Sequence, residues 1–380
     1  MRDAWRSRRR AVAVAGGVVL GVALAGPVQD GVRAAAHDAG PPPPPSAASL
    51  ERWRDALAWM DRHLPAGTVV LSDPATSYSV PMLTRHWVTS LIDQHSSPND
   101  PHALQRMLDA RDALDPYAPW SRTAEVVRRW GATAIALNGR FDEPPRMDVW
   151  SPGREWYGAA RARLEQAPAA FRRVWEVDHF SVYTIDTTAL ASLAGGGMPR
   201  PFVRPARPGE RARPVGALVP QLVAFRAGAR QAVTGDTLAG ALEWRADRPL
   251  PAGIYRASIR FDRALPADVP RAPIAVSKLW RKLVERVRGE RYRFRADHLP
   301  ASGAYGVDRW TPGEVVRDTF RIVVPADVAP GDYAVKVSMT RQPHYPNLAL
   351  RDLLSDDDLL DGLEVARLEI RRGGTPGTAR

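Results

Sequence analysis

The spacing of apolar residues changes partway along the chain, and this change limits the folds that the sequence can adopt. Between residues 48 and 188, helical spacing alternates with short apolar runs. Between residues 216 and 372, short alternating segments follow one another between turn signals. Strands that alternate with helices favour an α/β layer with a partly parallel sheet, and many short strands favour a sandwich. We therefore predict a two-domain α+β chain, with a three-layer-like α/β domain followed by an antiparallel β-sandwich.

The first domain, residues 48–188, begins with a predicted amphipathic helix, because Leu50, Trp53, Leu57 and Met60 recur at helical spacing. A further helix is predicted to begin with Ser121 as its N-cap and to end at Gly131. The remaining helices are expected at 77–84, 101–114 and 153–166. The strands are expected at 68–72, 86–92, 133–138, 171–177 and 179–185.

The second domain, residues 216–372, follows a glycine- and proline-rich stretch at 189–215 that is interpreted as an exposed linker. Turn signals such as Pro330-Gly331-Asp332 separate its short segments. Residues 373–380 are expected to form a disordered tail. The strands are predicted at 218–225, 237–245, 253–261, 291–295, 315–324, 333–339 and 364–370.

The first 30 residues have the pattern of an export or anchoring signal. Five arginines within the first ten residues precede an uncharged run from Ala11 to Gly26 that contains only alanine, valine, glycine and leucine. A positive flank before an apolar stretch is typical of a signal anchor, which would form an N-terminal hydrophobic helix, or of a signal peptide. Ala23 and Ala25 fit a cleavage site for the second alternative. A buried helix of a soluble protein is the third.

A proline-rich spacer is predicted for residues 31–47, because five consecutive prolines at 41–45 favour a stiff polyproline II segment. A spacer of this kind holds a folded domain away from a membrane. The sequence thus predicts a single-pass membrane protein with the bulk of the chain outside the cytoplasm. Secretion after cleavage of the signal is the alternative.

The composition excludes several classes of function. The chain has no cysteine, which removes disulfides, thiolate metal sites and a cysteine nucleophile. The formal net charge is +11, yet the basic residues do not form a known nucleic-acid motif, so no nucleic acid is expected as a partner. Without a phosphate-binding loop, a dinucleotide fingerprint or a metalloprotease motif, we expect neither cofactor nor metal.

Polar side chains gather after two predicted strands of the first domain, where open α/β sheets bind ligands. Asp73, Thr76 and Tyr78 follow the first strand, and His95 and Asp100 follow the second. These five residues are the candidates for ligand contact. Asp73, His95 and Asp100, with His102, also fit an acid/base pair or a metal site, while helix capping and turn formation are the simpler roles. No catalytic residue is assigned.

A predicted helix at 276–288 interrupts the strands of the second domain. Its apolar residues recur at helical spacing, and its other face is basic. A helix of this kind either packs onto the sandwich or lies on an anionic membrane surface. The candidate membrane-surface residues are Lys278, Trp280, Arg281 and Lys282.

Several segments of the chain, taken in order, carry a family resemblance. They read VVLSDPATSYSVPMLT (69–84), HSSPNDP (95–101), VWEVDHFSVYTI (174–185), GDTLAGALEWRADRPLPAG (235–253), GAYGVDRWTPGEVVRDTFRIVVP (303–325) and APGDYAVKVSM (329–339). With these segments the chain resembles the extracytoplasmic C-terminal region of bacterial GT-C-type membrane glycosyltransferases and related envelope proteins. The resemblance covers most of residues 48–345.

The resemblance implies a place in the cell envelope, near a lipid-linked glycan. Enzymes of this kind take their catalytic acidic residue from a polytopic membrane half, for which this chain has no counterpart, so no catalytic residue is carried over. The chain is therefore expected to be a membrane-anchored accessory module without catalytic activity of its own, which binds glycan or a polytopic glycosyltransferase. The alternatives are an independent hydrolase-like enzyme that uses the 73–102 loops, and a split fragment of a polytopic glycosyltransferase.

Overall fold

A computed structural model of the chain describes residues 47–91, 100–139, 150–270, 276–342 and 362–372. Its backbone contacts divide the chain into two units, Met1–Arg52 with Asp142–Pro144 and Trp53–Phe141 with Pro145–Arg380. Of the first unit, only residues 47–52 are described, as the start of a helix. Everything below concerns the second unit, whose described residues are α+β and form three sheets.

The first sheet has five strands in the order β2-β1-β3-β5-β4. β1 pairs in parallel with both β2 and β3, whereas β5 pairs antiparallel with β3 and β4, so the sheet is mixed. Its strands are β1 (Val69–Leu71), β2 (Trp87–Val88), β3 (Ala134–Asn138), β4 (Phe171–Val177) and β5 (Phe180–Ile185). The helices that accompany it are α2 (Ala47–His63), α3 (Pro74–Ser77), α4 (Val80–Leu83), α5 (Ala103–Ala113), α6 (Trp120–Trp130), α7 (Arg154–Glu165) and α8 (Thr187–Ser192).

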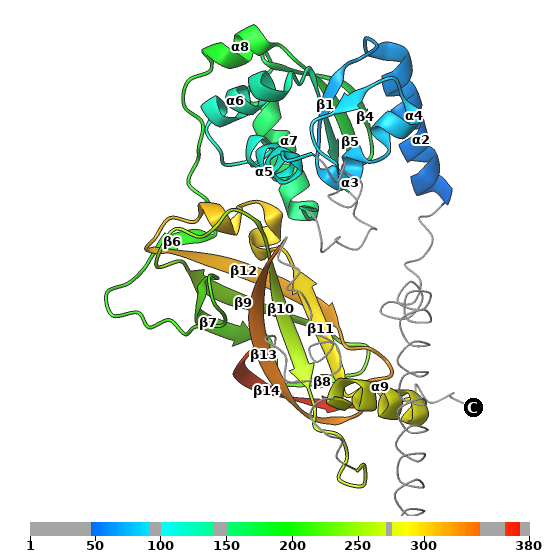
Figure 1. Ribbon diagram of the computed structural model, residues 1–380, viewed down its shortest axis with the longest axis vertical. Coiled ribbons are helices and arrows are strands. Elements are labelled where there is room, and N and C mark those ends of the chain that lie inside the picture. Colours follow the sequence, from blue (N-terminus) through cyan, green and yellow to red (C-terminus); the bar gives the residue numbers. More distant parts are fainter. Residues whose placement is uncertain (1–46, 92–99, 140–149, 271–275, 343–361, 373–380) are drawn as a thin grey trace, which may run out of the picture. The chain divides into compact units, whose positions relative to one another are not determined.

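Both faces of this sheet are buried, because successive side chains of a strand point to opposite faces. In β3, Ile135 and Leu137 join a hydrophobic core with residues of α5, α6 and α7. Ala134 and Ala136 face the other way and join a second core with residues of α2. Helices therefore cover the sheet on both sides (Figure 1).

The remaining strands form two sheets that share one hydrophobic core. Their orders are β11-β10-β13-β14-β8 and β6-β12-β9-β7. Along β10, buried and half-buried residues alternate, as expected for a strand with one covered face. The strands are β6 (Val203–Pro205), β7 (Gln221–Ala227), β8 (Gln231–Val233), β9 (Thr237–Arg245), β10 (Ile254–Asp262), β11 (Arg293–His298), β12 (Glu314–Val323), β13 (Gly331–Gln342) and β14 (Leu363–Arg371).

Helical segments also accompany these two sheets. The helix α9 (Ser277–Arg288) lies between β10 and β11 in the chain, and the 3₁₀ turns η3 (Pro300–Gly303) and η4 (Val307–Arg309) lie between β11 and β12. Figure 1 shows α9 at one end of the two sheets, where it crosses the strand direction. A pair of stacked sheets with a common core is the sandwich-like arrangement that the short strands predict.

Some local predictions differ from the structure. The helix expected from Ser121 begins at Trp120 after Pro119, although Gly131 ends it in the left-handed conformation as predicted. The helix expected at 77–84 is two short helices, α3 and α4. β6 falls inside the predicted linker, and β8 runs parallel to β14, so the sandwich is not purely antiparallel.

The apolar run 11–26, the prolines at 41–45, His95 and the tail at 373–380 lie outside the described residues. Within the residues that the structure places, none of the helices combines the length and the apolar character needed to cross a bilayer.

Candidate functional site

The carboxyl end of β1 holds the first group of candidate residues. The side chain of Asp73 is buried, and its Oδ1 accepts hydrogen bonds from the backbone N–H groups of Ala75 and Thr76 at 3.1 and 3.0 Å. Asp73 is thus the N-cap of α3, with Pro74 at the first helical position. The carboxylate that sequence reasoning named as a ligand contact serves the helix that follows it.

The other candidates near Asp73 are also packed within the fold. Thr76 is buried, and the half-buried ring of Tyr78 packs against the core that contains α5 and α6. The hydroxyl of Ser90, after β2, donates to the carbonyl of Ser72 at 3.4 Å. The ends of β1 and β2 are therefore adjacent, as their parallel pairing requires.

The second group of candidates lies before α5. Asp100 Oδ1 accepts from the backbone N–H of His102 at 2.8 Å, and its carboxylate lies 3.4 Å from the guanidinium of Arg106. These contacts order the turn that leads into α5. Asp73 thus caps α3, whereas Asp100 orders a turn that precedes α5, whose N-cap is His102. Within the described residues, no three His, Asp or Glu side chains gather in a way that would hold a metal ion.

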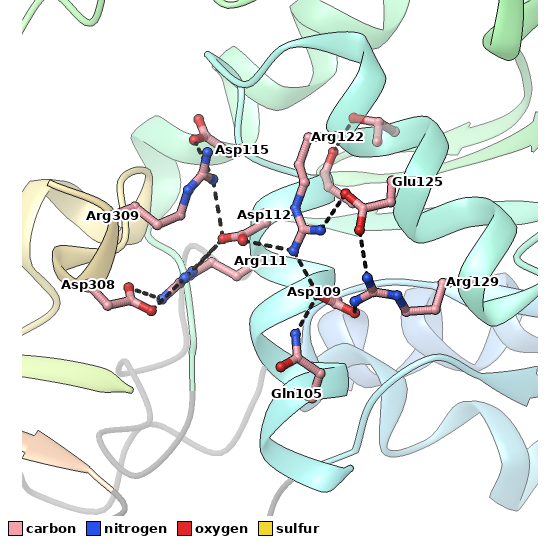
Figure 2. A network of polar contacts seen from close by, with 12 residues as sticks. Gln105, Asp109, Arg111, Asp112, Asp115, Arg122, Glu125, Arg129, Asp308 and Arg309 are labelled. Carbon is pink, nitrogen blue, oxygen red and sulfur yellow. Dashed lines mark hydrogen bonds and ion pairs between the residues drawn. The ribbon is translucent and has the colours of Figure 1, made fainter. Parts of the chain in front are cut away.

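A network of aspartates and arginines surrounds α5 (Figure 2), and the sequence analysis did not identify it. Asp109 is fully buried. Its carboxylate accepts from Arg122 at 2.7 Å, Arg129 at 2.8 Å, Trp130 at 2.9 Å and Gln105 at 2.8 Å. Burial favours a higher pKa for Asp109, but the hydrogen bonds from Trp130, Gln105 and Arg129 outweigh it and hold the pKa below its ordinary value.

The same network continues from α5 to η4. The guanidinium of Arg111 donates to Asp112 Oδ1 at 2.9 and 3.0 Å and lies 2.8 Å from the carboxylate of Asp308. Arg309 lies 3.2 Å from Asp112 and 3.4 Å from Asp115. Burial alone would lower the pKa of Arg111, but Asp112 and Asp308 raise it above its ordinary value. Asp109 and Arg111 therefore keep their charges across the ordinary pH range.

The chemistry of this network is structural. Its carboxylates and guanidinium groups neutralise one another in low-dielectric surroundings, where removing one member leaves an uncompensated charge. It connects α5 and α6 beside the first sheet with η4 beside the other two sheets. The sequence signal for it is the spacing of Asp109, Asp112 and Asp115 at intervals of three residues, the first two within α5 and the third just after its end.

A second buried polar group lies at the core of the two sheets. Asp318 has a fully buried side chain, and its carboxylate contacts His298 Nε2 at 2.9 Å, Trp244 Nε1 at 3.1 Å and the backbone N–H of Ala301 at 3.0 Å. The backbone of Ala301 and Ser302 is left-handed, with φ values of 51° and 54°. The bond from Ala301 to Asp318 therefore helps to hold a strained turn.

The basic helix α9 packs onto the sandwich through part of its surface. Val284 is buried, and the half-buried ring of Trp280 packs beside it while its Nε1 donates to the carbonyl of Pro270 at 2.9 Å. Arg281 Nη1 donates to the carbonyl of Arg263 at 2.9 Å. Trp280 and Arg281 are thus held by contacts within the fold. Lys282 is exposed, and Lys278 is half-buried.

An exposed apolar surface lies at the edge strand of the first sheet. Met82, Leu83 and Trp87 are exposed by 66%, 59% and 67%, and Arg85 lies exposed between them in the chain. We call Met82, Leu83, Arg85 and Trp87 the α4–β2 patch. Sequence reasoning missed this patch, because its residues fall in a segment predicted as a helix followed by a strand, where apolar side chains are expected to be buried.

The comparisons with known proteins find no match to a family model and no match among curated proteins. Among solved structures, the C-terminal globular domain of an oligosaccharyltransferase from Archaeoglobus fulgidus is similar at 12% identity and a TM-score of 0.25, covering 35% of this chain and 96% of that one. The C-terminal domain of wzt is similar at 11% identity and a TM-score of 0.26, covering 45% and 84%. A β-glucosidase from Listeria innocua in complex with glucose follows at 10% identity and a TM-score of 0.20, covering 41% and 16%. Scores this low assign no shared fold or function.

Proposed function

We propose that this protein is a membrane-anchored accessory module of the cell envelope that lies outside the cytoplasm. It acts by binding a glycan or a membrane glycosyltransferase rather than by catalysis. The arginine-flanked apolar run at 11–26 is its anchor, and the prolines at 41–45 are the spacer that holds the folded part away from the bilayer. The anchor keeps the module beside lipid-linked glycans and their enzymes.

The exposure of the α4–β2 patch is the main observation that supports a binding role. Its three large apolar side chains are each more than half exposed to water. Apolar surface that folding leaves exposed in this way is typical of an interaction site. Tryptophan, methionine and arginine are the side chains enriched at recognition surfaces. The flat ring of Trp87 also offers an apolar face on which the C–H face of a sugar ring can pack.

The polar residues of the 73–102 segment support binding over catalysis. Asp73 caps α3, and Asp100 orders the turn before α5. A general base must reach the proton that it removes within hydrogen-bonding distance, whereas these carboxylates already accept backbone N–H groups two or three residues further along the chain. Asp73 thus serves as a helix cap, and Asp100 serves as part of a turn.

A photo-crosslinking amino acid at position 87 of the full-length chain tests the proposal. The expected result, after irradiation in the organism of origin and membrane fractionation, is an adduct in the membrane fraction with a polytopic glycosyltransferase or with an envelope glycan. The matched control places the same amino acid at Val323, which is 58% exposed on β12. Equal adducts from both positions, or a chain recovered only in soluble form without an adduct, would overturn the proposal.

A further inference from the structure

The helix α9 has an outward face that combines apolar and basic side chains. Leu283 and Val287 are exposed by 42% and 78%, and they lie one turn apart on the same side of the helix. Lys282 and Arg286, also one turn apart, are exposed and directly precede them in the sequence. At about 100° per residue, this places the two basic side chains beside the two apolar ones.

The inward side of α9 is fixed by several contacts, so the outward face has a defined orientation. Val284 is buried against Tyr292 and Ala329, and the side chain of Glu285 accepts from the backbone N–H of Tyr292 at 2.8 Å. Gly289 ends the helix in the left-handed conformation, with its N–H bonded to the carbonyl of Glu285. Rotating the helix to bury Leu283 and Val287 would break these contacts.

We propose that the outward face of α9 docks on the surface of an anionic lipid bilayer through Leu283, Val287, Lys282 and Arg286. The helix has five basic residues and one acidic residue, so its charge is complementary to lipid phosphates. The exposed apolar pair enters the boundary between headgroups and acyl chains, as in interfacial amphipathic helices. An acidic polypeptide would be attracted by the charge but would not require the apolar pair.

The docking face differs from the one that the sequence indicated. The candidate membrane-surface residues from the sequence are Lys278, Trp280, Arg281 and Lys282. In the structure Trp280 packs against the small core of Val284, Tyr292 and Ala329, and the apolar residues that remain outward are nearer the end of the helix. The membrane-facing residues are therefore Leu283 and Val287, and Trp280 holds α9 on the sandwich.

The docking inference rests on the proposed anchoring of the chain at a membrane, and one experiment separates the two. The chain has no cysteine, so Val287→Cys in the full-length protein accepts a single environment-sensitive fluorophore. The labelled chain is reconstituted into vesicles of phosphatidylglycerol and phosphatidylcholine in equal parts, or of phosphatidylcholine alone. Flotation of the vesicles reports anchoring, and the emission of the fluorophore reports docking of α9.

The expected result is flotation with both compositions and a blue shift of the fluorophore with the anionic vesicles only. The same fluorophore at Val323→Cys is expected to show no shift. Lys282→Glu with Arg286→Glu is expected to lower the ratio of docked to undocked helix by more than roughly tenfold, since each basic residue near an anionic surface contributes about a fivefold factor. Arg128→Glu with Arg172→Glu, two exposed residues of α6 and β4, is the charge-matched control.

The other outcomes overturn one proposal or the other. Vesicles that float without the chain would overturn the proposed anchoring. A chain that floats without a shift at position 287, or with equal shifts in anionic and neutral vesicles, would overturn docking while the proposed function stands. A blue shift with added polyglutamate but not with anionic vesicles would overturn membrane docking and indicate an acidic polypeptide as the partner of α9.

Discussion

The guanidinium of Arg111 lies 2.8 Å from the carboxylate of Asp308, and the two residues are 197 positions apart in the sequence. Arg111 belongs to α5 beside the first sheet, and Asp308 belongs to η4 beside the other two sheets. The two side chains are exposed by only 5% and 7%. A pair buried to this extent is costly to break, because the remaining charge cannot be hydrated.

Asp308→Asn is therefore expected to lower the free energy of unfolding by about 3 kcal/mol, which is at the low end of the cost of breaking a buried ion pair. The cost is at the low end because Asp112 still compensates the charge of Arg111. Urea unfolding followed by tryptophan fluorescence measures the change. The control is Asp327→Asn, because Asp327 is half exposed and pairs with Arg291 at 3.3 Å. Its expected cost is less than about 1 kcal/mol. Equal costs would show that burial of the first pair has no energetic consequence.

Two glycines give a matched test of how tightly Arg111 is held. A Cβ at Gly306 would lie 2.3 Å from Arg111 Cζ, and the guanidinium is fixed by its aspartates, so Gly306→Ala is expected to cost about 2 kcal/mol. Gly158 is exposed in α7, and a Cβ added there would have no neighbouring atom within 4 Å. Gly158→Ala is expected to stabilise the protein by about 0.5 kcal/mol, because alanine favours the helix. Thermal unfolding compares them, and a Gly306→Ala protein as stable as the parent would contradict the close contact.

His298 is expected to make stability depend on pH. Burial favours a lower pKa, but the carboxylate of Asp318 at 2.9 Å outweighs it and raises the pKa of His298 above its ordinary value of 6.5. A raised pKa in the folded state means that protonation stabilises the fold. The contribution is complete below about pH 6.5 and is lost as the pH rises through the raised pKa of the folded state.

The measurement compares the parent with His298→Gln, which does not titrate, in urea unfolding over a series of pH values. The difference in the free energy of unfolding is expected to be larger at low pH and to shrink as the pH rises. The same slope in parent and variant would mean that His298 does not cause the pH dependence.

The sequence predicts the helices and strands that are determined by their own residues and immediate neighbours. The strand β4 is found at its predicted residues 171–177, and β5 lies within the predicted 179–185, with Asp178 at a positive φ of 48° in the turn between them. The strand β9 is found at its predicted residues 237–245. The three-residue strands β6 and β8 were missed, because each exists only through pairing with a strand that is distant in the sequence, β12 and β14. Nothing within three residues reveals such a partner.

The candidate sites were predicted less completely for the same reason. Capping by Asp73 follows from its position before proline, but the ion pair of Arg111 and Asp308 depends on a fold that brings distant segments together. In α9, the periodicity identifies an apolar side but cannot tell which part of that side the sandwich covers. Val284 is buried and Val287 is 78% exposed, although both are valines of the same helix.

The role of Asp73 is open to a test with two substitutions. Asp73→Ala removes the acceptor of the N–H groups of Ala75 and Thr76 and is expected to cost about 1 kcal/mol. Asp73→Asn keeps an oxygen that can cap the helix, so its expected cost is within about 0.5 kcal/mol. Thermal unfolding of both proteins measures the costs. If asparagine destabilised the protein as much as alanine, the negative charge of Asp73 would matter beyond capping.

Trp87 and Trp244 are expected to differ sharply when each is replaced by alanine. Trp244 is fully buried and donates to Asp318, so Trp244→Ala is expected to cost about 4 kcal/mol through the cavity and the lost hydrogen bond. Trp87 is 67% exposed, so Trp87→Ala is expected to change the free energy of unfolding by less than about 0.5 kcal/mol. Urea unfolding measures both. A large cost of Trp87→Ala would show that the α4–β2 patch stabilises the fold. The binding role predicts a small cost together with a second effect. In the Trp87→Ala protein, a crosslinker at Met82 would no longer form adducts with the membrane partner or the glycan.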